Sequence, residues 1–120
     1  MTDREIDALI AEKFIGGCEW SEQDGKRFLL TPSGYTLAVD YGNGDIQGKL
    51  LNYSTDPTAC ALILDEIERR GWGWDWEYPW QAERGDYQFR IRGKDYVLVS
   101  DANRYRAVCL AALRALGVEV

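Results

Sequence analysis

The chain has 120 residues, of which 46% are hydrophobic and 28% are charged, and its formal net charge is −6. This length and balance are typical of one soluble globular domain, and they exclude a disordered chain and two independent cores. The longest apolar run, residues 59–64, is far shorter than the roughly 20 residues that span a bilayer, so we expect no membrane helix. The negative charge also disfavours binding to nucleic-acid backbones.

The residues that are missing limit the chemistry further. Histidine is absent, and the three cysteines (Cys18, Cys60 and Cys109) are far apart in the sequence. The chain therefore lacks the commonest general base near neutral pH, and it has no cysteine pair at zinc-binding spacing. We expect no catalytic residues, no metal site, no cofactor and no enzymatic activity. Because the first residues are charged and form no signal peptide, we expect the protein in the cytoplasm.

In chain order, the first predicted element is a helix at the N-terminus. Thr2 and Glu5 are spaced as in a capping box, and Gly16-Gly17 is expected to end the helix. The apolar residues of this segment recur at helical spacing: Ile6, Leu9, Ile10 and Phe14. The polar stretch 18–26 that follows is predicted to be a loop.

Residues 35–50 are predicted to form a β-hairpin. Asn43-Gly44 is the strongest short turn signal available, because both residues tolerate positive φ angles. A two-residue turn there pairs Tyr41 with Ile46 and places the large apolar side chains on one face. We regard this hairpin as an addition to a single domain that comprises residues 1–120.

A second helix is predicted after the hairpin. Asp56 is a good N-cap residue, and Pro57 occupies the first helical position, where its missing N–H group costs nothing. Gly71 is expected to end this helix. Its buried stripe would consist of Cys60, Ile63, Leu64 and Ile67.

Strands are predicted next, because aromatic or apolar residues alternate with polar ones over 74–81 and again over 87–92. A turn at Gly93-Lys94 leads into a third strand. If this turn has two residues, Arg90 and Arg92 share a face with Val97 and Val99.

The last predicted element is a helix that is capped by Asp101 or Asn103 and runs to Gly117. The order of elements is then helix, hairpin, helix, three antiparallel strands and helix. This order predicts an α+β protein, a three-layer helix/sheet/helix sandwich with three helices and an antiparallel sheet of about three to five strands.

Three stretches of the chain together resemble a known family: Arg4–Lys13, Tyr53-Ser54-Thr55-Asp56 and Ala107–Ala115. The pattern resembles the phage ABA sandwich domain, a family of small phage and prophage proteins with a helix/sheet/helix fold. Residues 18–52 match no part of this pattern. The resemblance implies a phage protein in the cytoplasm of a bacterial host, and it implies no catalytic residues.

Two candidate ligand sites carry hydroxyl or aromatic groups. The first site is Tyr53, Ser54 and Thr55, which precede the second helix. Their polar groups either cap the free N–H groups at the start of this helix or bind a phosphate together with those N–H groups. The aromatic candidates are Trp72, Trp74 and Trp76. Their rings either fill the core or form a wall on which a nucleobase stacks.

A third candidate site consists of arginines in the second half of the chain. Arg90, Arg92 and Arg104 either pair with carboxylates or converge on an anion through forked hydrogen bonds.

These candidates lead to three hypotheses about function. The first is a non-catalytic phage protein that sequesters a small anionic, nucleotide-like immune signal of its host, as a counter-defence sponge. The second is a protein-interaction module that inhibits a host defence protein through the acidic N-terminal half and exposed aromatic residues. The third, which no spacing in the chain supports, is a nucleotide hydrolase. The oligomeric state is left open, and a homo-oligomer is compatible with each hypothesis.

Overall fold

The computed structural model describes residues 1–76 and 86–120, and the described strands form two antiparallel sheets. The N-terminal sheet has the order β1 (Glu19–Gln23), β2 (Lys26–Leu30), β3 (Thr36–Asp40) and β4 (Ile46–Gly48). The C-terminal sheet has the order β5 (Gly73–Trp76), β6 (Tyr87–Arg92) and β7 (Tyr96–Asp101). The remainder of the strand predicted over 74–81, with Tyr78, Pro79 and Trp80, lies outside the described residues.

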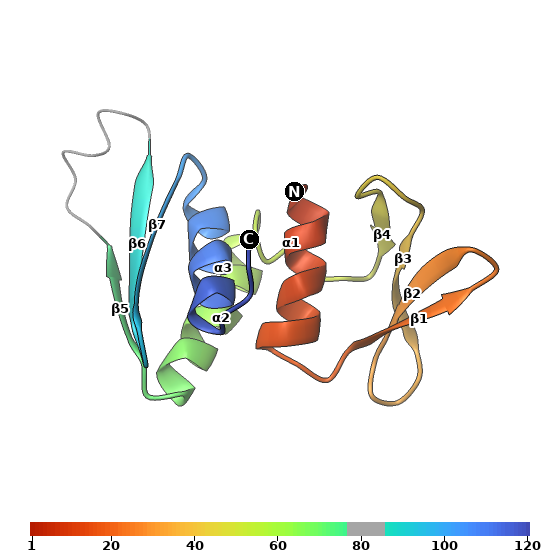
Figure 1. The fold of residues 1–120 in the computed structure, drawn as a ribbon, viewed down its shortest axis with the longest axis horizontal. Helices are drawn as coiled ribbons and strands as arrows, with labels where there is room; N and C mark the ends of the chain where they lie inside the picture. The colour runs from red at the N-terminus through yellow and green to blue at the C-terminus, as the bar shows by residue number, and fades with distance from the viewer. Residues whose placement is uncertain (77–85) are drawn as a thin grey trace.

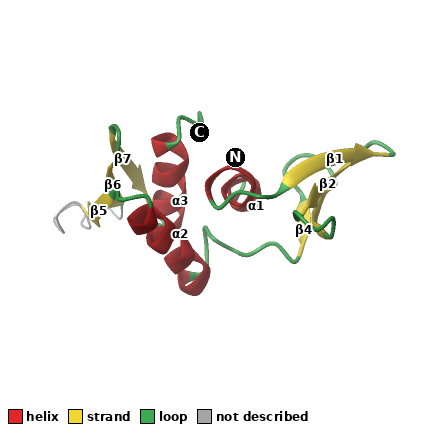
Figure 2. Cartoon of the chain, turned by 90° about the horizontal axis from the view of Figure 1, so that it is seen from below, coloured by secondary structure: helices red, strands yellow, loops and turns green. Residues whose placement is uncertain are grey.

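The helices lie between the two sheets (Figure 1). Helix α1 (Asp3–Leu9), which continues into a π-helical turn (Ile10–Phe14), lies next to the N-terminal sheet, and α2 (Pro57–Arg69) and α3 (Arg104–Ala115) lie next to the C-terminal sheet. Figure 2 shows the same succession from below. The predicted α+β class, with three helices and antiparallel pairing, is confirmed. The layers run sheet, helices, sheet, because residues 19–48 form a sheet of their own and do not join the C-terminal strands.

The helices begin where the sequence signals predict. The capping box of α1 is complete, with the Thr2 side chain accepting from the Glu5 N–H group and the Glu5 carboxylate accepting from the Thr2 N–H group. The Asp56 carboxylate accepts a hydrogen bond of 3.3 Å from the backbone of Ala59 at the start of α2. Of the two residues considered as the cap of α3, Asn103 is the one that caps it.

The prediction of a loop over residues 18–26 is wrong, because most of this stretch belongs to a hairpin. β1 pairs with β2 in antiparallel register from Glu19 opposite Leu30 to Gln23 opposite Lys26. The turn between them is Asp24-Gly25, and both residues have positive φ angles, 52° and 77°. A two-residue turn of this kind matches the right-handed twist of the strands. The N-terminal sheet therefore extends beyond the hairpin predicted over 35–50.

The predicted hairpin exists, but its register is shifted by one residue. Asp40 lies opposite Ile46, where the sequence analysis expected Tyr41. The reason is the length of the turn. Gly42, Asn43 and Gly44 all have positive φ angles, of 103°, 54° and 78°. Because Tyr41 bonds to Asp45 across the turn, the loop has three residues instead of two. The shift buries Ile46 and leaves Tyr41 exposed.

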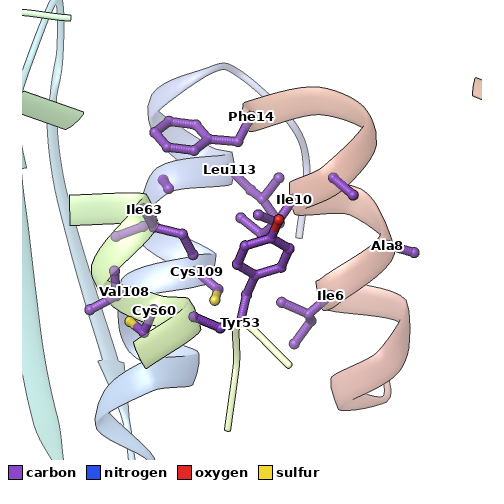
Figure 3. Packing of buried hydrophobic residues seen from close by; sticks show 14 of the residues in the cluster. Ile6, Ala8, Ile10, Phe14, Tyr53, Cys60, Ile63, Val108, Cys109 and Leu113 are labelled. Atoms are coloured by element: carbon purple, nitrogen blue, oxygen red, sulfur yellow. The ribbon is translucent and has the colours of Figure 1, made fainter. Parts of the chain in front are cut away.

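The main hydrophobic core lies between α1 and the pair α2 and α3 (Figure 3). Ile6, Ile10 and Phe14 recur every fourth residue along one side of the first helix, and all three are fully buried. From the other side, the core is closed by residues such as Ile63 and Leu113. None of the described helices is both long and apolar enough to cross a membrane.

Candidate functional site

The two faces of the C-terminal sheet separate Trp74 and Trp76 from Arg90 and Arg92. Trp74 lies opposite Ile91 and Trp76 opposite Phe89, so both indole rings lie on the face that packs against the helices. Arg90 and Arg92 alternate with those buried positions, and their side chains therefore lie on the outer face. The sheet does not bring these two groups of residues to one ligand.

The turn between β6 and β7 has three residues, 93–95, where two were expected. Arg92 consequently pairs with Tyr96, and the register of the strands is shifted by one. Val97 and Val99 face the helices instead of sharing a face with the arginines, so that part of the sequence prediction is wrong.

Trp72 and Trp74 fill space between the C-terminal sheet and the helices. The Trp72 ring lies 6.4 Å from the ring of Phe14, and the guanidinium group of Arg70 lies 5.3 Å from it. The indole Nε1 of Trp74 donates a hydrogen bond of 3.2 Å to the Glu68 carboxylate. Both rings are half-buried and in contact with the core, which is the arrangement expected of packing residues.

The outer face of the C-terminal sheet carries an ion pair. Arg90 donates two hydrogen bonds of 2.7 Å each to the Asp75 carboxylate, one to each oxygen. The Arg92 guanidinium group lies 3.8 Å from the same carboxylate, and 64% of its side chain is exposed. A forked pair of this kind occupies the donors that an anionic ligand would need on Arg90.

The residues before α2 are used in holding the fold together. Tyr53 is buried, and burial raises the pKa of its hydroxyl group. The backbone N–H group of Ser54 donates to the Asp7 carboxylate at 2.8 Å, and the Ser54 hydroxyl donates to the backbone oxygen of Asp3 at 3.3 Å. Thr55 is exposed. The Asp56 cap supplies a carboxylate at this helix start, where a phosphate would compete with it.

Asp7 belongs to a buried polar network between α1 and the segment that leads into α2. Its side chain is fully buried, and burial raises its pKa, although the hydrogen bonds from Ser54 and Arg4 act in the opposite direction. Arg4 lies 3.1 Å from the Asp7 carboxylate and also donates to the backbone oxygens of Ile46 and Leu50. This network ties the N-terminal helix to the chain that connects the two sheets.

Two of the predicted site residues, Trp76 and Arg104, do lie in one cluster, together with two tyrosines. The Trp76 and Tyr87 rings meet edge to face, with their centroids 6.2 Å apart. The Arg104 guanidinium group lies 5.5 Å from the Tyr87 ring and 5.5 Å from the Tyr105 ring. Trp76 is 36% exposed and Tyr87 is 40% exposed. We call these four residues the aromatic cluster.

A second feature, which the sequence analysis missed, is a cleft of roughly 170 Å³ between α1 and the N-terminal sheet. Its lining includes Glu5, Glu12, Trp20, Arg27 and Asp40. We call it the cleft beside α1. The sequence analysis predicts a loop around Trp20, and a loop prediction offers no reason to place this tryptophan opposite the first helix. The turn signal Asp24-Gly25 could have revealed the strand.

The cysteine thiols are not activated. Burial raises the pKa of Cys60 to about 12, and it also raises the pKa of Cys18 and of Cys109. Deprotonation, which a thiol needs to act as a nucleophile, is therefore suppressed at all three positions. Among residues 1–76 and 86–120, no three cysteine or carboxylate side chains are grouped closely enough to hold a metal ion.

Comparisons with protein-family models, with curated proteins and with solved structures found no match to this chain. The resemblance to the phage ABA sandwich domain therefore stays a prediction.

Proposed function

We propose that the protein is a non-catalytic binding protein that acts by occupying the surface of a partner protein. The aromatic cluster is the observation that carries this proposal. Tryptophan, tyrosine and arginine dominate the energetics of protein interfaces. The two aromatic residues bury large areas at a small cost in conformational entropy, and arginine adds forked hydrogen bonds and stacking on aromatic rings. In this chain, Trp76, Tyr87 and Arg104 combine these residue types with substantial exposure to solvent.

The nucleotide-sponge hypothesis has less support from the geometry. It requires several stacking rings and guanidinium groups around one hollow, but Trp74 and Arg90 project from opposite faces of the C-terminal sheet, and Arg104 is the one predicted arginine that lies in the aromatic cluster. The phage origin and a host defence protein as the partner rest on the family resemblance, and both remain part of the proposal.

Affinity capture tests the proposal. The immobilised protein and two variants are incubated with a lysate of the cells in which the protein acts. The first variant carries Trp76→Ser and Arg104→Glu in the aromatic cluster. The second carries Tyr35→Ser, which removes a ring that is 74% exposed from the other end of the molecule. We expect the wild type and Tyr35→Ser to retain one protein in stoichiometric amount, and the cluster variant to lose it.

Equal capture by the cluster variant, or capture by none of the proteins, would contradict the proposal. Thermal unfolding in the presence of cyclic nucleotides and ADP-ribose derivatives gives the competing hypothesis its own test. A stabilising shift in the wild type that disappears in the cluster variant would favour the sponge, because ligand binding to the folded state raises the unfolding temperature. The same unfolding curves establish that each variant is folded.

A further inference from the structure

We infer that the outer edge of β7 pairs with β7 of a second copy of this chain, which joins the two C-terminal sheets into one. β7 is the last strand in the order β5-β6-β7. Among residues 1–76 and 86–120, β6 is the one strand that pairs with it. The inference goes beyond the proposed function, because this edge is a surface outside the aromatic cluster.

The register of β6 and β7 shows which backbone groups are directed toward the edge. In an antiparallel pair, residues that exchange hydrogen bonds with the neighbouring strand alternate with residues whose N–H and C=O groups point away from it. The Gly93 N–H group donates to the backbone oxygen of Asp95 at 3.3 Å, so the next bonded positions of β7 are 97 and 99. The backbone groups of Tyr96, Leu98 and Ser100 therefore point away from β6, and all three residues are exposed.

β7 lacks the features with which proteins usually protect a sheet edge, namely charged residues, short strands and bends. The edge strands of the N-terminal sheet have them. β1 carries the exposed side chains of Glu19 and Glu22, and β4 has only three residues, of which Gly48 has a φ angle of 138°. β7 has six residues, Tyr-Val-Leu-Val-Ser-Asp, without proline, glycine or a basic residue. A long, apolar edge of this kind is typical of a strand that pairs with another.

The side chains of β7 complement those of a second β7. Tyr96 and Leu98 are its large exposed residues, at 59% and 41%, and both lie on the outer face of the sheet. If a twofold axis passes Val97, Tyr96 of each copy lies opposite Leu98 of the other. The two copies then form two aromatic–aliphatic pairs across the axis, and each opposed pair exchanges two backbone hydrogen bonds. The interface is closed, because both copies use the same surface.

The charges at the ends of β7 favour this register. Moving the axis by one residue toward the C-terminus would place Asp95 of each copy opposite Asp101 of the other, and like charges directly opposite are destabilising. With the axis at Val97, Asp101 instead lies beside the turn that carries Lys94 of the second copy. Arg106 already lies 3.2 Å from the Asp101 carboxylate, and the lysine adds a second cation near it.

Sedimentation equilibrium tests the inference on the wild type and two matched variants. At about 100 μM we expect the wild type to have twice the 13.7 kDa mass of one chain. Leu98→Lys places a charge on the edge and should be monomeric. It also reduces the net charge from −6 to −5, so overall repulsion does not explain the loss. Leu62→Lys makes the same change on α2, at a residue of similar exposure (46%), and should remain dimeric.

A monomeric wild type, or equal masses for the two variants, would overturn the inference. Thermal unfolding of each variant establishes that it is folded. These measurements contain no partner protein, so their failure and the failure of the affinity capture are distinguishable.

Disulfide cross-linking tests the register. Tyr96→Cys and Leu98→Cys are each combined with Cys18→Ser, because the other two native cysteines are buried. Opposed residues that exchange hydrogen bonds have Cα atoms about 5.5 Å apart, a common separation in disulfides. Oxidation of a mixture should therefore join one variant to the other. Either variant alone should cross-link little, because its two cysteines are diagonal neighbours about 7–8 Å apart. Preferential cross-linking of Leu98→Cys with itself would contradict an axis at Val97.

Discussion

Asp7 is a fully buried carboxylate whose partners come from two parts of the chain. Arg4 approaches it from the same helix, and the backbone of Ser54 approaches it from the start of α2. Removing water from a carboxylate is costly, and the hydrogen bonds only offset that cost. The ionised form is therefore penalised by folding, which is the physical meaning of the raised pKa.

The pH dependence of stability tests this description of Asp7. Because the folded-state pKa is raised, the contribution of this group to stability is complete below pH about 3.9 and is lost as the pH rises through the folded-state pKa. We expect the free energy of unfolding of the wild type, relative to that of Asp7→Asn, to increase as the pH falls from neutral toward this value. Urea unfolding at a series of pH values measures both.

The comparison with Asp7→Asn isolates one group. Glu5 and Glu66 have lowered pKa values, owing to hydrogen bonds from Thr2 and Arg69, so their contributions are lost on acidification. These effects occur in both proteins and cancel in the difference. A difference that stays constant over the pH range would show that folding leaves the pKa of Asp7 unchanged, and a difference that decreases on acidification would show that folding lowers it; either result contradicts this description.

At the level of elements, Gly48 sets how closely β3 and β4 approach. Its φ angle is +138°, and a Cβ atom there would lie 2.5 Å from the backbone oxygen of Leu37 and 2.9 Å from the Cα atom of Ala38. The clash is with backbone atoms, which cannot move aside as a side-chain end can. Only a glycine fits this position of the N-terminal sheet.

We expect Gly48→Ala to destabilise the protein by about 2–4 kcal/mol, since it adds a steric clash to backbone strain. Gly34→Ala is the matched control, because Gly34 also has a positive φ angle, +88°, but open space around its missing Cβ atom. It should cost only about 1–2 kcal/mol. Urea unfolding measures both changes. Equal costs would mean that the strands can separate to admit a methyl group.

The elements that the sequence predicted best are those with local signals at their ends. Thr2, Asp56 and Asn103 cap the three helices as expected, because capping depends on residues within one turn. β1 was missed for the opposite reason. Trp20 is its one large apolar residue, so the strand has no alternating pattern, and only Asp24-Gly25 marked the hairpin.

Turn length decided how well the candidate sites could be predicted. The turn over 42–44 and the turn over 93–95 each have one residue more than expected, and one extra residue moves a strand by one position. The identity of the aromatic residues and arginines was available from the sequence, but the faces on which they lie depend on strand pairing. Tyr87 and Arg104 meet through the tertiary fold, which no local pattern encodes.

On the scale of the whole molecule, the cleft beside α1 and the aromatic cluster belong to different ends of the fold. The longest dimension is 49 Å, and the helices separate the N-terminal sheet from the C-terminal sheet along it (Figure 1). The cleft belongs to the first of these sheets and the aromatic cluster to the second. Substitutions in the cleft should therefore leave partner binding at the aromatic cluster unchanged, as expected of distant sites with no shared contacts.

The dissociation constant of the captured partner, compared between Arg104→Glu and Arg92→Glu, tests the account most directly. Both side chains are exposed and undergo the same change of charge, but Arg104 belongs to the aromatic cluster and Arg92 lies on the outer face of the C-terminal sheet. We predict that Arg104→Glu raises the constant at least about tenfold and that Arg92→Glu changes it less than about twofold. The reverse order would place the partner on the outer face and contradict the proposed interface.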